Sequence, residues 1–179
     1  FDSAGEVYAS SIFQFSSAIR ESVNATWPGV IWGGTGVKVD SNLTEIDAAV
    51  DWNGVKPDYT LYPAFPFSLG FSQRGCRLKC GFCVVPRKEG APKAVSSIHA
   101  LWRGEPYPRA VILLDNDFFG QPREEWQEKI REIKDGHFRV SLCQGINIRQ
   151  VDEAAAAALA SIEYRDNEFK ERILYTAWD

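Results

Sequence analysis

Apolar positions in the second half of the chain recur with two periods, one typical of buried strands and one typical of amphipathic helices. Residues 111–114 form a continuous apolar run, as expected for a strand buried on both faces. Over residues 122–133, Trp126, Ile130 and Ile133 share one helical face. The full pattern predicts strands over 67–73, 111–114, 138–143 and 173–178, and helices over 96–103, 122–133 and 152–162.

This alternation predicts an α/β fold built from parallel βαβ units. Right-handed crossovers would curl such units into part of a (β/α) barrel. Residues 68–179 supply four strands and three helices of this plan, and we expect them to form one domain, a partial barrel. Ligands of parallel α/β folds bind at the carboxyl ends of the strands, so functional residues are expected in the loops that follow them.

Residues 1–67 form a separate region of the pattern. A strand over 7–13, a helix over 16–23 and an apolar run that ends in glycines at 33–36 predict a small Rossmann-like α/β segment. A structural turn is the favoured interpretation of the glycines, because they lack the Lys-Ser/Thr of a P-loop and a full Gly-x-Gly-x-x-Gly. Residues 55–66 contain three prolines and predict a linker or wrapping segment.

The composition is that of a globular chain, with one local exception in charge. The 179 residues are 45% hydrophobic and carry a net charge of −4, which argues against a nucleic-acid-binding surface over the whole chain. Residues 74–93 carry a single acid, Glu89, among six bases. These bases indicate either a solvated loop or a local attraction for an anionic partner, a phosphate or a carboxylate. They are Arg74, Arg77, Lys79, Arg87, Lys88 and Lys93.

No stretch approaches the roughly 18 to 20 apolar residues of a membrane helix, and no secretory signal pattern opens the chain. We therefore expect no membrane partner and a cytoplasmic setting, in which thiols stay reduced. The sequence begins with Phe1 and contains no methionine, which indicates a piece of a longer product.

Cys76, Cys80 and Cys83 follow one another with Cys-x3-Cys-x2-Cys spacing. Three clustered thiolates can hold a [4Fe–4S] cluster by three irons and leave the fourth iron open for another ligand. A disulfide would leave one of the three unpaired. The spacing favours a cluster, and a disulfide or free thiols remain open as alternatives.

Zinc is the other alternative. A structural zinc site usually draws its four ligands as two pairs of residues, and here only single residues could complete it. Cys143 itself lies in an alternating apolar run, so a buried core thiol is the favoured interpretation for it. The remaining candidates for a fourth zinc ligand are Cys143, His99 and His137.

The segment 75–83, with the aromatic Phe82 directly before the third cysteine, resembles the cluster loop of the radical S-adenosylmethionine (radical SAM) enzymes. The resemblance implies a six-unit (β/α) partial barrel, of which this sequence supplies about four units. It implies that S-adenosylmethionine binds the open iron and is cleaved to a 5′-deoxyadenosyl radical, which attacks a substrate that the sequence does not identify. An electron donor such as flavodoxin or ferredoxin would be a partner. Because the cofactor carries this chemistry, no side chain is assigned a catalytic role.

The resemblance also implies cofactor contacts. Radical SAM enzymes place a short polar motif after the second strand, where it accepts hydrogen bonds from the methionyl amine. Asp115 and Asn116 stand there, without the family's Gly-Gly-Glu form and with a capping turn as the alternative. After the third strand, Asn147 and Arg149 would share a face if the strand continued, and Arg149 would bind a carboxylate or form an ion pair at the rim. Phe82 would pack against the adenine or the cluster.

Two further resemblances bear on the type of enzyme. Residues 1–67 loosely resemble the cobalamin-binding domain that precedes the barrel in one branch of radical SAM enzymes. Cobalamin is therefore a candidate cofactor, although the segment has no histidine to ligate it. Residues 81–87 resemble the cluster loop of methylthiotransferases that modify tRNA or ribosomal protein, but the three further cysteines of those enzymes are missing from 1–67. The alternative from another class is a zinc-stabilised module that binds nucleic acid or protein through the basic loop.

Overall fold

The computed structural model describes residues 6–37 and 57–177, and the chain divides into two compact units, Phe1–Trp52 and Asn53–Asp179. The sequence pattern instead puts a boundary after residue 67. In the structure, residues 57–67 wrap onto the second unit: the Leu69 amide donates to the Tyr59 hydroxyl at 2.8 Å, and Arg103 donates to the Phe65 carbonyl at 2.7 Å. Residues 55 and 56 of the predicted linker lie outside the described residues.

The first unit is one βαβ motif. Its two short strands pair in parallel, and the Arg20 guanidinium donates to the Gly36 carbonyl at 3.0 Å, which ties the helix to the turn after the second strand. Gly34 has a φ of +93°, as the predicted glycine turn requires. The elements in chain order are β1 (Tyr8–Ser10), η1 (Gln14–Ser16), α1 (Ser17–Thr26) and β2 (Ile31–Gly33).

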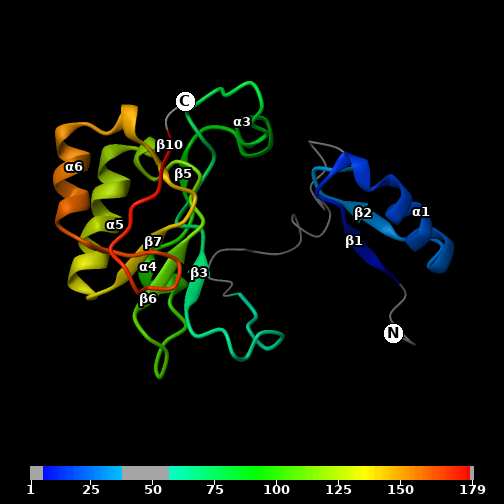
Figure 1. Cartoon of the computed structure of the whole chain (residues 1–179), viewed down its shortest axis with the longest axis horizontal. Helices are drawn as coiled ribbons and strands as arrows, with labels where there is room; N and C mark the ends of the chain where they lie inside the picture. The colour runs from blue at the N-terminus through cyan, green and yellow to red at the C-terminus, as the bar shows by residue number, and fades with distance from the viewer. Residues whose placement is uncertain (1–5, 38–56, 178–179) are drawn as a thin grey trace. The chain divides into compact units, whose positions relative to one another are not determined.

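The second unit is built on a four-stranded parallel sheet whose strand order follows the chain, β3-β6-β7-β9 (Figure 1). Because every strand runs the same way, the loops that follow them emerge at one edge of the sheet. The predicted α/β class with a parallel sheet is therefore confirmed. The strands are β3 (Ser68–Gly70), β6 (Ala110–Leu113), β7 (Arg139–Leu142) and β9 (Glu163–Tyr164).

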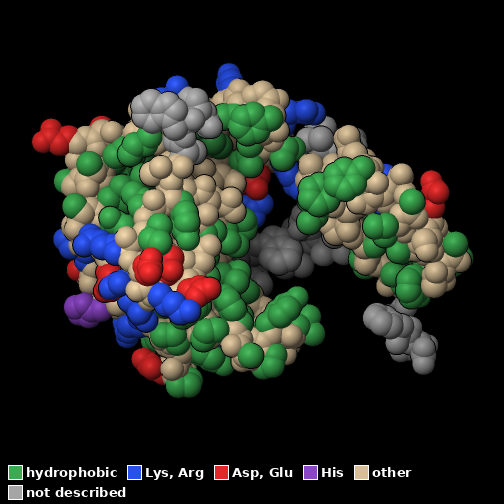
Figure 2. Space-filling model, in the orientation of Figure 1, with side chains coloured by type: hydrophobic (Ala, Val, Ile, Leu, Met, Phe, Trp, Pro, Cys, Tyr) green, Lys and Arg blue, Asp and Glu red, His purple; other side chains and the backbone are tan. Residues whose placement is uncertain are grey.

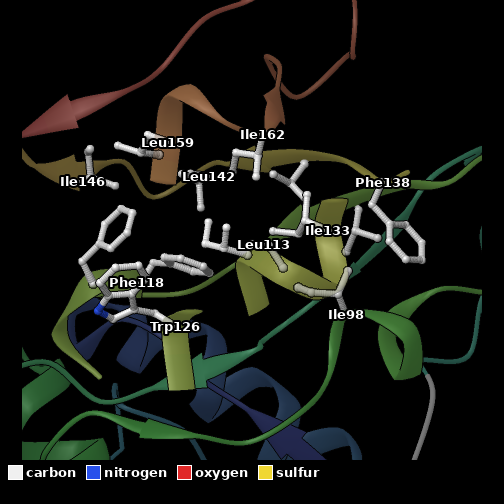
Figure 3. Close-up of a cluster of buried hydrophobic side chains, with 14 of the residues drawn as sticks. Ile98, Leu113, Phe118, Trp126, Ile133, Phe138, Leu142, Ile146, Leu159 and Ile162 are labelled. Carbon is white, nitrogen blue, oxygen red and sulfur yellow. The ribbon is translucent and has the colours of Figure 1, made fainter. Parts of the chain in front are cut away.

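Helices α4 (Ile98–Leu101), α5 (Arg123–Asp135) and α6 (Glu153–Ala160) pack on one face of this sheet. Alternate strand residues point toward them, and Figure 3 shows Leu113 and Leu142 among side chains of the helices. Burying this apolar surface is the main driving force for the unit. The predicted face of α5 is buried as expected, with Trp126, Ile130 and Ile133 at 7% exposure or less.

The opposite face of the sheet is covered by aromatic side chains. Ile112 and Ala110 point to this side, where they pack with Phe169 and Phe67. The rings of Phe67 and Phe169 lie 4.6 Å apart between centroids. Since Phe67 belongs to the wrapping segment, that segment is part of the second unit's core rather than a spacer.

The predicted strand over 173–178 is not the fourth strand of the sheet. β10 (Thr176–Ala177) pairs instead with β8 (Ile146–Asn147) in a separate two-stranded sheet. The fourth position is taken by β9, whose Glu163 lies opposite Arg139 of β7. The apolar run at 173–175 has the pattern of a strand. However, Ile162 is buried in the core directly after α6, so the chain already pairs with β7 at residue 163 and fills the fourth position.

Helix α4 is shorter than predicted. It is a single turn, capped by the Ser97 hydroxyl, which accepts a hydrogen bond from the Ala100 amide at 3.0 Å. Trp102 is already extended, so the helix ends there. The other elements lie in the loops after the strands: β4 (Gln73–Arg74), α3 (Val85–Glu89), β5 (Lys93–Ala94), η2 (Phe118–Gly120) and η3 (Ile148–Gln150).

Candidate functional site

The three clustered cysteines lie in one loop, which two short strands close at its base. β4 pairs antiparallel with β5, so residues 75–92 leave and re-enter the fold at the same place. We call these residues the cysteine loop. The Cys76 amide donates to the Gly90 carbonyl at 3.2 Å and adds one more bond across the base. The loop follows β3, at the sheet edge where ligands of parallel α/β folds bind.

No disulfide joins any of the chain's four cysteines, all of which lie within the described residues. Cys76, Cys80 and Cys83 are each half-buried. Burial raises the pKa of the Cys76 thiol, the Leu78 amide that donates to its sulfur opposes this, and nearby Asp117, Cys83 and Cys80 raise the pKa further.

Over residues 6–37 and 57–177, no three His, Cys, Asp or Glu side chains are placed to hold a single metal ion. A mononuclear zinc site needs such a group, since Zn–S bonds of about 2.3 Å draw all donors around one point. A [4Fe–4S] cluster binds each thiolate through a different iron, so its sulfurs stand further apart. The described residues thus show no ready-made metal site, and both the cluster and the zinc alternative stay predictions.

Glu89, the one acid among the six bases, anchors the cysteine loop. Its Oε1 accepts from Arg74 Nη2 at 2.8 Å, and its Oε2 accepts from the Gly75 amide at 2.9 Å and from Asn116 Nδ2 at 3.0 Å. The end of α3 is thereby tied to β4 and to the loop after β6. Glu89 was not predicted as a site residue, although its isolation among six bases is a signal that could have found it.

Asp115 fastens the start of the loop to the end of β6. Its Oδ1 accepts from the amides of Ser72 and Gln73 at 2.7 and 3.0 Å, and its Oδ2 accepts from the Ser72 hydroxyl at 2.5 Å. The side chain is buried, and burial raises its pKa to about 6, although these hydrogen bonds and the charge of Lys129 lower it. The carboxylate predicted to contact the cofactor amine is thus occupied by the protein's own backbone.

Gln73 links this anchor to Asp117. Its side chain is fully buried, with Nε2 donating to the carbonyls of Arg74 and Gly75 at 2.7 Å each and Oε1 accepting from the Asp117 amide at 3.0 Å. No sequence pattern singled out Gln73. A polar residue at the end of a predicted strand is common, and only its burial reveals that Gln73 organises the loop.

Asp117 stands next to the first cysteine. Its Oδ2 accepts from the Arg77 amide at 3.2 Å, pairs with Arg77 Nε at 3.2 Å and lies 3.9 Å from Cys76 Sγ. A buried carboxylate therefore lies between a thiol and a guanidinium. Asp117 directly follows the predicted residues Asp115 and Asn116, but no contact was predicted for it.

A small pocket, partly open to solvent, lies where the loops after β3, β6 and β7 meet. Arg77, Asn116, Asp117 and Asn147 are among the residues that line it, whereas Asp115 is not. The sequence-predicted residues Asn116 and Asn147 are thus brought together on one pocket wall.

Asn147 contributes an unpaired donor to this region. Its Oδ1 accepts from the Arg149 amide at 3.0 Å, but its Nδ2 is buried and finds no acceptor in the described structure. A buried N–H without a partner costs free energy, commonly about 1 to 3 kcal/mol, so such groups call for an explanation. A ligand atom that accepts a hydrogen bond in the pocket would supply one.

Arg149 and Phe82 are not brought into the pocket. β8 ends at Asn147 and η3 begins at Ile148, so the side-chain alternation expected to align Asn147 with Arg149 stops there, and Arg149 is exposed. The Phe82 side chain is 87% exposed at the outside of the cysteine loop. Cys143, predicted to be a buried core thiol, is half-buried and donates to the Leu113 carbonyl at 3.2 Å.

Five of the six bases of residues 74–93 fall into two groups. Arg74 forms an ion pair with Glu89, and Arg77 forms one with Asp117, so both cations are paired with carboxylates of the fold itself. Lys79, Arg87 and Lys93 are exposed, and Figure 2 shows Lys and Arg side chains near hydrophobic ones in the region of α3. The local attraction for anions predicted from the sequence rests on this second group.

Across residues 6–37 and 57–177, none of the helices combines the length and the apolar character that crossing a membrane would require. No family model matches the chain, and no curated protein or solved structure is significantly similar to it.

Proposed function

We propose that this chain acts as a radical SAM enzyme, with a [4Fe–4S] cluster in the cysteine loop and S-adenosylmethionine in the adjoining pocket. The observation that carries the proposal is the placement of the loop. Three half-buried thiols lie in the loop that follows the first strand of a parallel sheet. Arg77 and Leu78 of the same loop line a pocket together with Asn147, whose Nδ2 is buried without an acceptor in the described structure.

The donor set fits such a cluster. Thiolates are its usual ligands, and Cys76, Cys80 and Cys83 would hold three irons and leave the fourth for the cofactor. When bound, the cluster supplies the electron for reductive cleavage of S-adenosylmethionine. The bonds of Glu89, Asp115 and Gln73 hold the loop in place independently of any metal.

The pocket walls suit the polar end of S-adenosylmethionine, which carries an ammonium and a carboxylate. Asn147 Nδ2 would donate to the carboxylate, and doing so would satisfy the one unpaired nitrogen of its side chain. Asp117 and the Asn116 amide oxygen would accept from the ammonium. This assignment keeps the amine contact predicted for Asn116 and replaces Asp115, whose oxygens already accept hydrogen bonds within the fold, by Asp117.

The fold supports the same proposal at the coarser level. Strands follow one another in chain order, helices cover one face, and the loops after β3, β6 and β7 meet at the pocket. A partial (β/α) barrel has these features. We propose that architecture for the second unit, with the first unit as an appended α/β segment.

Anaerobic purification followed by iron and sulfide analysis tests the proposal. We expect iron and acid-labile sulfide in equal amounts, with Cys80→Ala losing the cluster and Cys143→Ala keeping it as the matched control. With dithionite or reduced flavodoxin as electron donor, the loaded chain should form 5′-deoxyadenosine from S-adenosylmethionine. Finding one zinc ion per chain, or finding that Cys80→Ala retains as much iron as the wild type, would contradict the proposal.

A further inference from the structure

Asp117 makes more contacts than the capping of a turn requires. Its backbone amide donates to the buried Gln73 side chain, its Oδ2 accepts from the Arg77 amide, and the same oxygen lies 3.9 Å from Cys76 Sγ. The residue is 9% exposed. A single carboxylate oxygen therefore touches both the first cysteine and the residue that follows it.

We propose that Asp117, paired with Arg77, is a positioning residue that orients Cys76 and sets the reduction potential of the cluster. This inference rests on the proposed function, because it concerns the same cluster.

The positioning follows from a continuous chain of bonds. Asp115 fixes the Gln73 backbone, the Gln73 side chain fixes the Asp117 backbone, and the Asp117 side chain fixes the Arg77 backbone next to Cys76. Each bond joins groups that are buried or half-buried, where geometry is held more tightly than at the surface. The position of Cys76 is thus fixed by residues at the end of β6 as well as by the loop itself.

The effect on potential follows from charge. The potential of an iron–sulfur cluster depends on nearby charge and on hydrogen bonds to its sulfurs. A carboxylate close to a ligating sulfur disfavours adding an electron, and a guanidinium favours it. The Arg77 side chain is 33% exposed against 8% for Asp117, so solvent screens the cation more than the anion. The pair should therefore act as a net negative influence beside Cys76.

Two substitutions test this by shifting the potential in opposite directions. Asp117→Asn keeps an acceptor for the Arg77 amide and removes the charge, and we expect the equilibrium constant for one-electron reduction by dithionite to rise about tenfold, or about 59 mV. Arg77→Gln keeps the backbone donor and removes the cation, so the constant should fall, by less than that. One electron passes from dithionite to the bound cluster, and no protein bond forms or breaks.

The measurement is an anaerobic redox titration of the reconstituted full chain, followed by electron paramagnetic resonance. Asp166→Asn is the matched control, because Asp166 also accepts from backbone amides, those of Lys170 and Glu171, in a different loop. We expect no shift in the control. Equal shifts of the same sign in Asp117→Asn and Arg77→Gln, or no shift in either, would overturn the inference while leaving the cluster and the proposed function standing.

A chain that takes up no cluster at all would instead defeat the proposed function. In that case amide hydrogen exchange on the metal-free chain decides the positioning role by itself. Asp117→Ala removes the acceptor of the Arg77 amide and should speed its exchange about tenfold relative to wild type, with Asp166→Ala leaving it unchanged. An Arg77 amide that exchanges equally in both variants would overturn the role.

Discussion

Asp115 and Asn147 are both polar residues at the ends of strands, and the fold treats them in opposite ways. Asp115 receives three hydrogen bonds from Ser72 and Gln73. Asn147 receives one and is left with a buried nitrogen that has no acceptor in the described structure. The polar atoms of Asp115 are accounted for by the fold, whereas the buried Nδ2 of Asn147 calls for an explanation, and the ligand contact proposed above would be one.

The raised pKa of Asp115 makes stability depend on pH. Its folded pKa of about 6 lies above the ordinary 3.8, so the stability it contributes is present in full below about pH 4 and is lost as the pH rises through 6. The loss corresponds to about 3 kcal/mol at most. The positive charge of Lys129 lowers the pKa of Asp115 and so reduces this loss of stability. The pKa of the Cys143 thiol is raised above its ordinary 9.0, so this thiol does not titrate between pH 4 and pH 6.

We therefore expect Asp115→Asn to remove this dependence. The asparagine keeps an acceptor for the Ser72 amide and offers a donor to the Ser72 hydroxyl. Urea unfolding between about pH 4 and pH 7 should show the wild-type free energy of unfolding falling relative to that of the variant. Parallel curves for the two proteins would show that Asp115 is not the group responsible.

Asn147→Asp tests the ligand contact proposed for the unpaired nitrogen. The aspartate keeps the acceptor for the Arg149 amide but replaces the donor by a charge that repels a carboxylate. We expect binding of S-adenosylmethionine to the cluster-loaded chain to weaken about tenfold or more, since a lost bond to a charged group costs about 1.5 to 3 kcal/mol. Equilibrium dialysis measures this. Gln144→Glu, an exposed amide-to-acid change in the same loop, should leave binding unaltered.

At the scale of elements, the cysteine loop depends on one glycine at its base. Gly75 has a φ of +82°, and a side chain there would collide with the carbonyl of Ala91, shortly before the returning strand β5. Its amide also donates to Glu89. The β4–β5 pairing therefore needs a residue without a Cβ at this position.

Gly75→Ala should lower the free energy of unfolding by about 1 to 3 kcal/mol and loosen the loop base. The reason is the combination of unfavourable φ and backbone collision. Chemical denaturation gives the first quantity, and amide exchange of Cys76, which bonds across the base, gives the second. Gly81→Ala is the control in the same loop, because Gly81 has open space around its Cα and no positive φ. Equal effects of both substitutions would contradict the argument.

At the scale of the whole molecule, the second unit depends most on the larger of its two buried clusters, which the sheet shares with α4, α5 and α6. Leu113 is fully buried at its centre and precedes the loop that carries Asp115. Residues so placed link the stability of the fold to the geometry of the site. Disturbing the core should therefore loosen the cysteine loop through its anchors.

Leu113→Ala should destabilise the second unit by about 2 to 5 kcal/mol, because it removes buried methyl groups and leaves a cavity. Leu61, at 79% exposure, provides the control, and Leu61→Ala should change the free energy of unfolding by less than about 0.5 kcal/mol. Thermal and urea unfolding report both values. If Leu113→Ala lowered the free energy of unfolding no more than Leu61→Ala does, the cluster around Leu113 would not be the main source of the second unit's stability.

Local patterns were enough to predict the α/β class, the strands at β3, β6 and β7, and helices α5 and α6. These elements follow from the period of apolar residues and from capping residues such as Asp152, whose carboxylate accepts from the Ala155 amide. The spacing of the three cysteines is likewise a property of the chain alone. Their role as cluster ligands stays a prediction.

Only the tertiary structure decided which polar side chains serve the fold and which face the pocket. Asp115 and Ser72 lie 43 residues apart in the chain, and their bond exists because two parallel strands end at the same edge of the sheet. The same adjacency buries Gln73, and the early end of β8 turns Arg149 away from Asn147. Such contacts depend on which strands become neighbours, and the local pattern around each residue carries no information about that choice.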